Sequence, residues 1–348
     1  MYIREALCIS PQNTYARDGI TSPVKQYDGL RYSALEPDYT GLIPLAQLRR
    51  MGKAVRMGIG AALPLVSKNP DIQGIIIGTA YGGLEDCVRF LNQIVDYEEG
   101  SLTPTNFVQS TPNAVAGSLA LMGKNHGYNA THVNNGHSFE NALLDAQLLL
   151  AENENYTCLL GAVEELSDYN YNIDKLAGLF KEEAVSSDQL FNSGTEGTVC
   201  GESSVMFVVS NQPENARAKV VDLAMISFPT EDELNARIDQ LLVQHQLSVS
   251  DIDTLILGYN GDSRNDHWYT DLSERQFPES TVLGYKNLVG EFPTSGSFAV
   301  WMANSLVGGN EIPQESVIRK GSIGNPKRIL IYNHYKGIQH SLILVEAV

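Results

Sequence analysis

One short turn in this sequence stands where enzymes often place a nucleophile. The stretch from Tyr128 to Ala151 predicts a strand, a tight turn at Asn134-Asn135-Gly136 and then a helix, because apolar side chains recur at helical spacing after the turn. A helix that starts directly after a strand points its free N–H groups and the positive end of its dipole at the turn. Such a field lowers the pKa of a thiol and binds an oxyanion, but Gly136 at the apex has no side chain.

The neighbours of this apex are the remaining candidates for chemistry in the turn. His137 is a candidate nucleophile or acid–base group, although a helix N-terminus disfavours an imidazolium cation, and a structural or capping role is the competing interpretation. Ser138 has good N-cap chemistry. His334, near the C-terminus, is a more distant candidate. We expect no metal and no cofactor, because five further histidines have no metal-ligand spacing. These are His126, His132, His245, His267 and His340.

The elements that position these residues alternate between strand and helix patterns. The runs IIIGTAYGG and LILGYNGD occupy matching places in the two halves, and each is an apolar strand ending in a glycine turn. Continuous apolar runs are typical of strands buried on both faces. The polar segment 211–215 contains a proline and predicts a link between the halves. We therefore expect an α/β protein of two halves, residues 1–212 and 213–348, with both sheet faces covered.

Hydrophobic periodicity sets the expected bounds of each element. We expect strands over residues 2–9, 72–79, 130–133, 156–163, 203–210, 218–226, 254–259, 281–283, 328–332 and 341–345. We expect helices over residues 45–63, 84–97, 110–122, 139–151, 231–246, 266–275 and 293–307, with a short amphipathic piece over 171–180.

Charge and composition exclude several classes of function. The 348 residues include 41 acidic and 24 basic side chains, for a net charge of −17, which disfavours binding to nucleic acid. The densest basic run, Arg49 to Arg56, is either a solvated helix face or a small docking patch. The four cysteines show no CxxC pairing, which predicts buried thiols in a reducing compartment. No signal peptide or membrane-spanning run is evident, and we expect a cytoplasmic protein.

Several motifs, taken in order, carry a resemblance to a known family. They are IIIGTAYGG, STPNAVAGSLAL, GAVEEL, GTVCGESSVMFVV and KNLVGEFPTSGSFAVWMANSLVGGNEIP. Along nearly its whole length the chain resembles a β-ketoacyl synthase, the condensing enzyme of the thiolase superfamily. The resemblance implies a thiolase-like layered αβαβα fold made of two pseudo-duplicated βαβαβαββ halves.

The catalytic places of that family are changed in this chain. Condensing members use a Cys at the turn and two His from the second half, and the matching positions here are Gly136, Asn260 and Glu291. The family's active-site Lys is retained as Lys286, and the Phe-Gly-rich gate becomes the segment 333–337. A glycine cannot hold an acyl thioester, and an ionised Glu291 would repel the enolate that the histidines normally stabilise. Condensation by this chain alone is therefore not expected.

A ketosynthase fold without its Cys resembles the chain-length factors of type II polyketide and fatty acid systems. The sequence is closest to subunits that serve aryl polyene or flexirubin-type pathways. The resemblance implies a heterodimer with an active ketosynthase, formed through the strand at about residues 129–133. It also implies that the ketosynthase subunit recruits the acyl carrier protein. A homodimer that binds acyl groups or the carrier is one alternative. An acyltransferase or hydrolase that uses His137, Ser138 or a cysteine is the other.

Overall fold

In the computed structural model, which describes residues 1–321 and 326–348, one mixed sheet of eleven strands runs through both halves of the chain. From one edge, the N-terminal half contributes β4 (Tyr128–His132), β3 (Gly74–Gly78), β5 (Thr157–Glu164), β7 (Ser203–Ser210) and β1 (Tyr2–Ile9). The order continues with β8 (Ala218–Ser227), β13 (Gln339–Ala347), β12 (Arg328–Tyr335), β9 (Thr254–Leu257), β10 (Thr281–Gly284) and β11 (Val317–Arg319). A separate two-stranded sheet joins β2 (Arg31–Tyr32) to β6 (Cys200–Gly201).

The two halves repeat one strand pattern. In the N-terminal half, β3 lies parallel to β4 and β5. Strand β7 pairs antiparallel with β5, and β1 pairs antiparallel with β7. In the C-terminal half, β9 lies parallel to β10 and β12, and β13 and β8 follow antiparallel. The halves join where Tyr2 and Ile3 of β1 pair with β8. The repeat agrees with the expected pseudo-duplication, whereas the exact boundary after residue 212 stays a prediction.

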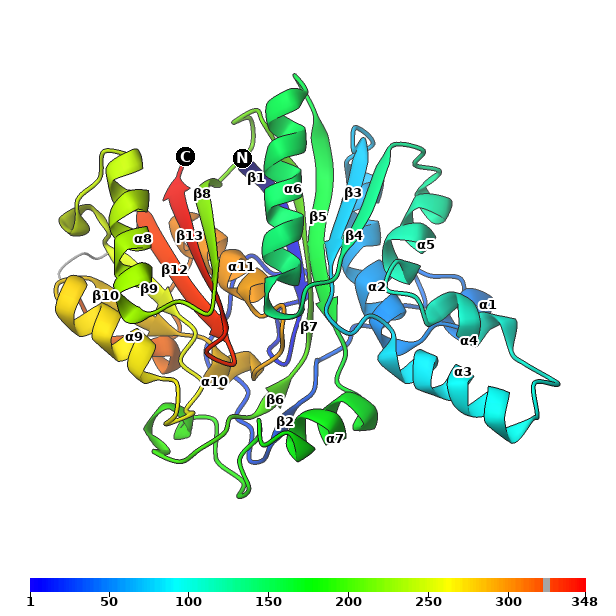
Figure 1. The fold of residues 1–348 in the computed structure, drawn as a ribbon. Helices are drawn as coiled ribbons and strands as arrows, with labels where there is room; N and C mark the ends of the chain where they lie inside the picture. Colours follow the sequence, from blue (N-terminus) through cyan, green and yellow to red (C-terminus); the bar gives the residue numbers. More distant parts are fainter. Residues whose placement is uncertain (322–325) are drawn as a thin grey trace.

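Helices cover the sheet in three layers (Figure 1). Helices α6 (Ser138–Glu152) and α11 (Gly296–Val307) lie in the middle, between the two halves. Helices α2 (Lys53–Lys68) and α5 (Ala114–Gly123) cover the outer face of the N-terminal half, and α8 (Glu231–Gln244) and α9 (His267–Asp271) cover that of the C-terminal half. The remaining helices are α1 (Leu45–Leu48), α3 (Leu84–Asp96), α4 (Pro104–Gln109), α7 (Asp168–Leu176) and α10 (Lys286–Val289). Three apolar clusters fill the spaces between these layers, which gives the five-layer αβαβα order.

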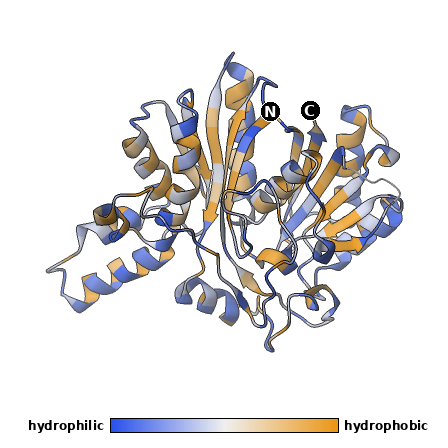
Figure 2. Ribbon diagram, turned by 180° about the vertical axis from the view of Figure 1, so that it is seen from behind, coloured by the Kyte–Doolittle hydropathy of each residue, from blue (hydrophilic) through white to orange (hydrophobic). Residues whose placement is uncertain are grey.

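The helices on both faces of the sheet explain why the central strands are apolar along their whole length. All residues of β3 and β9 are buried, as expected for strands with helices on both faces. Hydropathy follows the same arrangement, with apolar residues gathered on the strands and the inner helices (Figure 2). Within residues 1–321 and 326–348, no helix is both long enough and apolar enough to cross a bilayer.

Tertiary contacts correct the helix predicted over residues 45–63. It is two helices, α1 and α2, separated at Gly52, where the backbone is extended. The Asp86 carboxylate occupies the space of a Cβ on Gly52, and the Gln109 side chain accepts the Gly52 N–H. These partners come from a distant part of the chain, so the local apolar pattern could not reveal the break.

Three further predicted bounds are wrong. The helix expected over residues 110–122 begins only at Ala114, because a residue before proline, here Thr111, disfavours helical backbone. The helix expected over 266–275 is α9 followed by a π-helical turn at Leu272–Gln276. The gate segment expected after residue 332 is mostly strand, because Asn333, His334 and Tyr335 pair with β13.

Candidate functional site

The turn before α6 has no room for a nucleophile. Gly136 is buried, and a Cβ added to it would lie 2.2 Å from Cβ and 2.8 Å from Cγ of Tyr335. Real Cβ atoms do not approach this closely, so Tyr335 fills the space that a Cys side chain would need. The Gly136 N–H, which the resemblance would offer to an oxyanion, donates instead to Gln339 Oε1 at 2.8 Å. Both the thiol position and this donor are therefore taken by the β12–β13 hairpin.

His137 and Ser138 lie in this turn but are engaged in holding it. The His137 ring nitrogen Nε2 lies 3.0 Å from the His340 carbonyl oxygen, and burial lowers the pKa of His137. The Ser138 hydroxyl accepts the Asn134 N–H and donates to the Asn135 carbonyl, each at 2.8 Å. Ser138 is the first residue of α6, and this hydroxyl fixes the preceding turn, so the expected N-cap role of Ser138 is wrong. Neither side chain is free to attack a substrate.

The fold brings Asn260, from the turn after β9, against Lys286 and Glu291, which lie at the two ends of the short segment around α10. Glu291 Oε2 accepts hydrogen bonds from Lys286 Nζ and from Asn260 Nδ2, both at 2.7 Å. All three side chains are buried, and Lys286 has no exposed area at all. A buried carboxylate is tolerated where a buried ammonium neutralises it and hydrogen bonds complete its shell. Glu291, at one of the positions that the resemblance assigns to the family's histidines, therefore forms a closed ion pair with Lys286, and Asn260, at the other position, donates a hydrogen bond to the same carboxylate.

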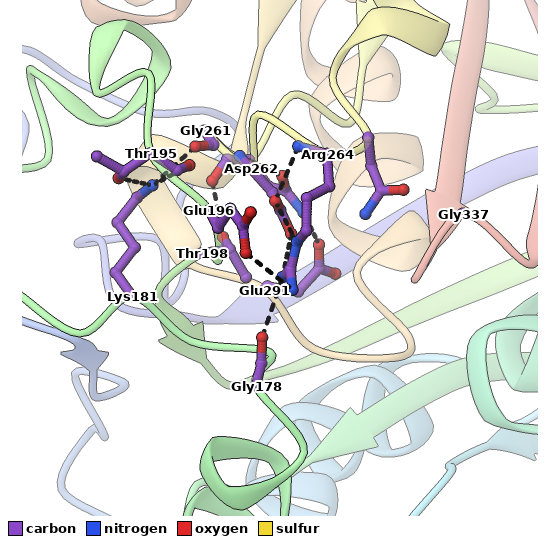
Figure 3. A network of polar contacts seen from close by, with 12 residues as sticks. Gly178, Lys181, Thr195, Glu196, Thr198, Gly261, Asp262, Arg264, Glu291 and Gly337 are labelled. Atoms are coloured by element: carbon purple, nitrogen blue, oxygen red, sulfur yellow. Dashed lines mark hydrogen bonds and ion pairs between the residues drawn. The ribbon is translucent and has the colours of Figure 1, made fainter.

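The turn that carries Asn260 is clamped from both sides (Figure 3). Lys181 Nζ donates to the Gly261 carbonyl at 2.7 Å and to both oxygens of Thr195, at 2.8 and 3.1 Å. On the other side, Arg264 forms a two-pronged ion pair with Asp262, with bonds of 2.7 and 2.8 Å. Thr198 Oγ1 donates to the Asn260 carbonyl at 2.7 Å. These contacts fix Asn260 toward Glu291 and leave it little freedom to reorient toward a substrate.

A second network of polar side chains covers the site around Glu291 from outside. The Tyr335 and Tyr81 hydroxyls lie 3.1 Å apart, and Tyr81 donates to Asp174 at 2.9 Å. Lys336 also donates to Asp174, at 3.0 Å, and thereby ties α7 to the hairpin. The cavity that these side chains share with Glu291 has about 10 Å³ of space for water, which is room for about one molecule. An acyl chain does not fit this cavity.

His334 occupies a neighbouring packed region. Its ring stacks on Tyr269 with centroids 4.6 Å apart, and its Nε2 lies 3.3 Å from the Asn265 carbonyl oxygen. Burial holds the pKa of His334 well below its usual value, so this imidazole is neutral at physiological pH. His334 is a packing residue in this structure.

Buried carboxylates and thiols complete the description of the site. Burial raises the pKa of Glu140 to about 7 and that of Glu164 to about 8. Glu164 and Glu202 hydrogen-bond backbone amides of loops. Burial raises the pKa of Cys8 and Cys158 to about 12, so neither is a thiolate at neutral pH.

Two side chains of the basic run from Arg49 to Arg56 form ion pairs within the protein. Lys53 contacts Glu202 and Arg56 contacts Glu36, each at 2.6 Å. Arg49 and Arg50 remain exposed. Only these two arginines are left for the small docking patch that the sequence suggested, and such a patch stays a prediction.

The residues that sequence reasoning missed are Tyr81, Asp174 and Gln339. Each becomes meaningful only through a partner far along the chain. Tyr335 was within the altered gate segment, and the missing side chain at Gly136 was the signal that another residue must fill its space. Among residues 1–321 and 326–348, no group of three or more metal-ligating side chains is placed to hold a metal ion.

Comparison of the fold with solved structures gives similar proteins over the whole chain. The ishigamide ketosynthase/chain length factor matches with a TM-score of 0.77 at 14% identity, over 100% of this chain and 99% of that one. A ketosynthase in complex with its chain length factor from Xenorhabdus doucetiae matches with a TM-score of 0.75 at 14% identity, over 100% and 98%. A β-ketoacyl synthase from Burkholderia phymatum STM815 matches with a TM-score of 0.73 at 16% identity, over 91% and 88%.

Sequence comparison is narrower but assigns the family. A search of curated proteins found no significant relative. The profile described as "Beta-ketoacyl synthase, N-terminal domain" matches residues 25–232, which is more than half of the chain. Together with a thiolase-like fold over its full length, this match shows that the chain belongs to the β-ketoacyl synthase family.

Proposed function

We propose that this chain is a non-condensing, chain-length-factor-like subunit that pairs with an active ketosynthase in fatty acid or polyketide biosynthesis. The observation that carries the proposal is the filled space at Gly136. A Cβ there would meet Tyr335 at 2.2 Å, and the Gly136 N–H is already bound to Gln339. Condensation needs a thiolate and an oxyanion donor at this position, and neither is provided.

The changed histidine places support the same proposal. In place of two neutral imidazole donors, the centre holds the Glu291 carboxylate, paired with Lys286. Gly136, Asn260 and Glu291 are thus proposed as retired catalytic positions, and Lys286 as a structural partner of Glu291. One altered position is compatible with a modified reaction, whereas three altered positions, two of them bound to each other and the third blocked by Tyr335, favour a lost reaction.

The free edge of the sheet supports a partner subunit. Strand β4 pairs with β3 on one side and ends the sheet on the other. Open edges favour pairing with another chain. Val133, directly after β4, and Leu144 and Leu148, on α6, expose apolar side chains. We infer that β4 forms the interface with a ketosynthase, and that the carrier protein is recruited through that partner.

The solved relatives and the cysteines add support. Two of the similar structures are described as a ketosynthase together with a chain length factor. Among the described residues all four cysteines are free, and three are buried, which favours a reducing, cytoplasmic compartment.

Co-expression with each ketosynthase found among its neighbouring genes tests the proposal. We expect a stable complex of equal stoichiometry by light scattering, and condensation of malonyl thioesters only when the partner's own active-site Cys is intact. A thiol-directed acyl analogue is expected to label the partner and not this chain, as measured by mass spectrometry. Condensation by this chain alone, or an acyl adduct on His137 or Ser138, would reject the proposal in favour of an enzyme. A lone homodimer that captures an acylated carrier would reject it in favour of a binding protein.

A further inference from the structure

The chain contains two asparagine–glycine pairs, and each includes a position that the resemblance assigns to the family's catalytic residues. Asn135–Gly136 lies in the turn before α6, and Asn260–Gly261 lies in the turn after β9. Asparagine is among the chemically labile residues of proteins. It loses its side-chain amide most readily before glycine, because glycine has no side chain to hinder attack by its backbone nitrogen. The surroundings of each pair therefore decide which of the two can react.

The Asn260–Gly261 pair is locked inside the fold. Asn260 is 5% exposed, its Nδ2 donates to Glu291 at 2.7 Å and its Oδ1 accepts the Asp262 N–H at 3.1 Å. The Gly261 N–H, whose nitrogen would attack, donates to the Asp266 carboxylate at 2.9 Å. Both reacting groups of this pair are thus engaged and removed from bulk water.

The asparagine of the other pair is open to water. Asn135 is exposed, and its φ of +47° lies in the left-handed region. Its backbone carbonyl accepts a hydrogen bond from the Ser138 hydroxyl at 2.8 Å, whereas its side-chain amide has no hydrogen-bond partner among residues 1–321 and 326–348. The carbon that would be attacked is therefore accessible in Asn135 and enclosed in Asn260.

One side chain restrains the attacking group of the exposed pair. The Gly136 N–H donates to Gln339 Oε1 at 2.8 Å. Gln339 Nε2 in turn donates to the carbonyl and to the side-chain oxygen of Asn134, each at 3.3 Å. Gln339 thus holds the residues on both sides of Asn135. Ring closure requires the Gly136 nitrogen to turn toward the Asn135 side chain, so this clamp opposes the attack.

We propose that Asn135 is a site of spontaneous deamidation and that Gln339 sets its rate. The Gly136 nitrogen bonds to Cγ of Asn135, the Cγ–Nδ2 bond breaks, and ammonia leaves with the proton of the backbone amide. Water then opens the cyclic imide at either carbonyl and gives aspartate or isoaspartate. The net change is hydrolysis of one amide, with no oxidant or reductant.

The product changes the turn that joins the free sheet edge to α6. Either product adds a negative charge, and isoaspartate also lengthens the backbone beside the Gly136 N–H that Gln339 holds. The inference goes beyond the proposed function and does not depend on it, because it concerns the isolated chain.

Incubation of the purified full chain at mildly alkaline pH tests the site. Peptide mapping by mass spectrometry is expected to show progressive conversion of Asn135 and none of Asn260. The rate should rise with pH, because the attacking nitrogen must lose its proton. An isoaspartate-specific methyltransferase with labelled S-adenosylmethionine should label the aged chain, and Asn135→Gln should abolish that label. Asn260 also serves as an internal check, since global unfolding would expose both pairs.

A matched pair of substitutions tests the role of Gln339. Gln73 also accepts a backbone N–H through Oε1, that of Thr157 at 3.3 Å, and it precedes β3 at the end of the sheet away from the turn. We expect Gln339→Ala to convert Asn135 at least fivefold faster than the wild type, and Gln73→Ala to change the rate less than twofold. Thermal unfolding checks that both variants fold.

Three results would overturn the inference. The first is no conversion of Asn135, in the wild type or in Gln339→Ala, within the time that converts the guanidinium-denatured chain. The second is equal conversion of Asn135 and Asn260 in the folded protein, which would trace the reaction to unfolding. The third is an unchanged rate in Gln339→Ala, which would remove the control assigned to the clamp.

Discussion

Two consecutive parts of one segment behave in opposite ways. Strand β4, from Tyr128 to His132, has no fully buried residue and lies at the free edge of the sheet. Residues 136–140, which follow β4 after three exposed residues, are all buried, and Gly136 and His137 bind a hairpin more than 190 positions away. The inner part is buried within the fold and closed to a substrate, while the outer part leaves a sheet edge accessible to another chain. The chain thus joins a closed, buried turn to a sheet edge that no strand among the described residues covers.

The largest expected effect is on the buried ion pair of the inner region. Lys286→Ala leaves the Glu291 carboxylate buried without a counter-ion, and we expect a loss of about 3–5 kcal/mol in the free energy of unfolding. Removing the exposed Arg89 from its pair with Glu85 is expected to cost about 0.3–0.5 kcal/mol. Urea denaturation of both variants measures the difference. Equal losses would show that the Lys286–Glu291 pair is not a structural element.

The pH dependence of stability also reports on the inner region. Burial raises the pKa of Glu140 from 4.5 in its ordinary state to about 7. The folded protein then holds a proton that the unfolded chain releases, so this contribution is complete below pH 4.5 and is lost as the pH rises toward 7. The slope is at most about 1.4 kcal/mol per pH unit.

Glu140→Gln removes this titration. Comparing the variant with the wild type therefore separates the contribution of Glu140 from that of other titrating groups. The buried His340, whose pKa is lowered to about 4, changes stability in the opposite direction between pH 4 and 6.5. The difference in unfolding free energy between the variant and the wild type is therefore the quantity to measure. We expect the variant to gain relative to the wild type from pH 4.5 to 7. A difference that stays constant across this range would contradict a buried, protonated Glu140.

Filling the glycine position tests the closure directly. Gly136→Cys places its Cβ against Tyr335, and we expect a loss of about 1–3 kcal/mol without any acyl-enzyme formation. Gly41→Ala is the control, because nothing lies within 4 Å of a Cβ there. Combining Gly136→Cys with Tyr335→Gly should recover part of the loss, as measured by thermal unfolding. A stable Gly136→Cys variant would mean that the turn still has room for a nucleophile.

The smallest effect on stability is expected in the outer region. Val133→Asp should change the free energy of unfolding by no more than about 0.5 kcal/mol, because the side chain is exposed. The same change should weaken binding to a ketosynthase partner by about tenfold, or 1.4 kcal/mol. Calorimetry and denaturation of one protein sample measure the two values together. A stability loss larger than the affinity loss would remove the contrast between the two regions.

Much of the fold was predictable because its signals are local. The strands β1 and β7 lie where the apolar runs predicted them, and most other elements differ by one to four residues. Errors arose where a distant contact overrides local periodicity. Gly52 is held extended by Asp86 and Gln109, and residues 333–335 join β12 because β13 pairs with them.

The site was predictable as a set of positions and not as an arrangement. The resemblance named Gly136, Asn260, Glu291 and Lys286, and the last three do meet in the structure. It gave no indication that His137 and Ser138 would be occupied by hydrogen bonds within the fold. Whether a side chain is free depends on its neighbours in space, which sequence spacing does not specify.

Three properties can be read directly from the sequence: no Cys stands at the turn, apolar strands alternate with helices in two similar series, and the chain is strongly acidic. These properties follow from residue types and from short-range periodicity. The closure of the centre depends on the folded arrangement, since Gly136 and its partner Gln339 are 203 positions apart in the chain. The same holds for the exposure of β4 at the edge of the sheet, because exposure is a property of packing and not of any single segment.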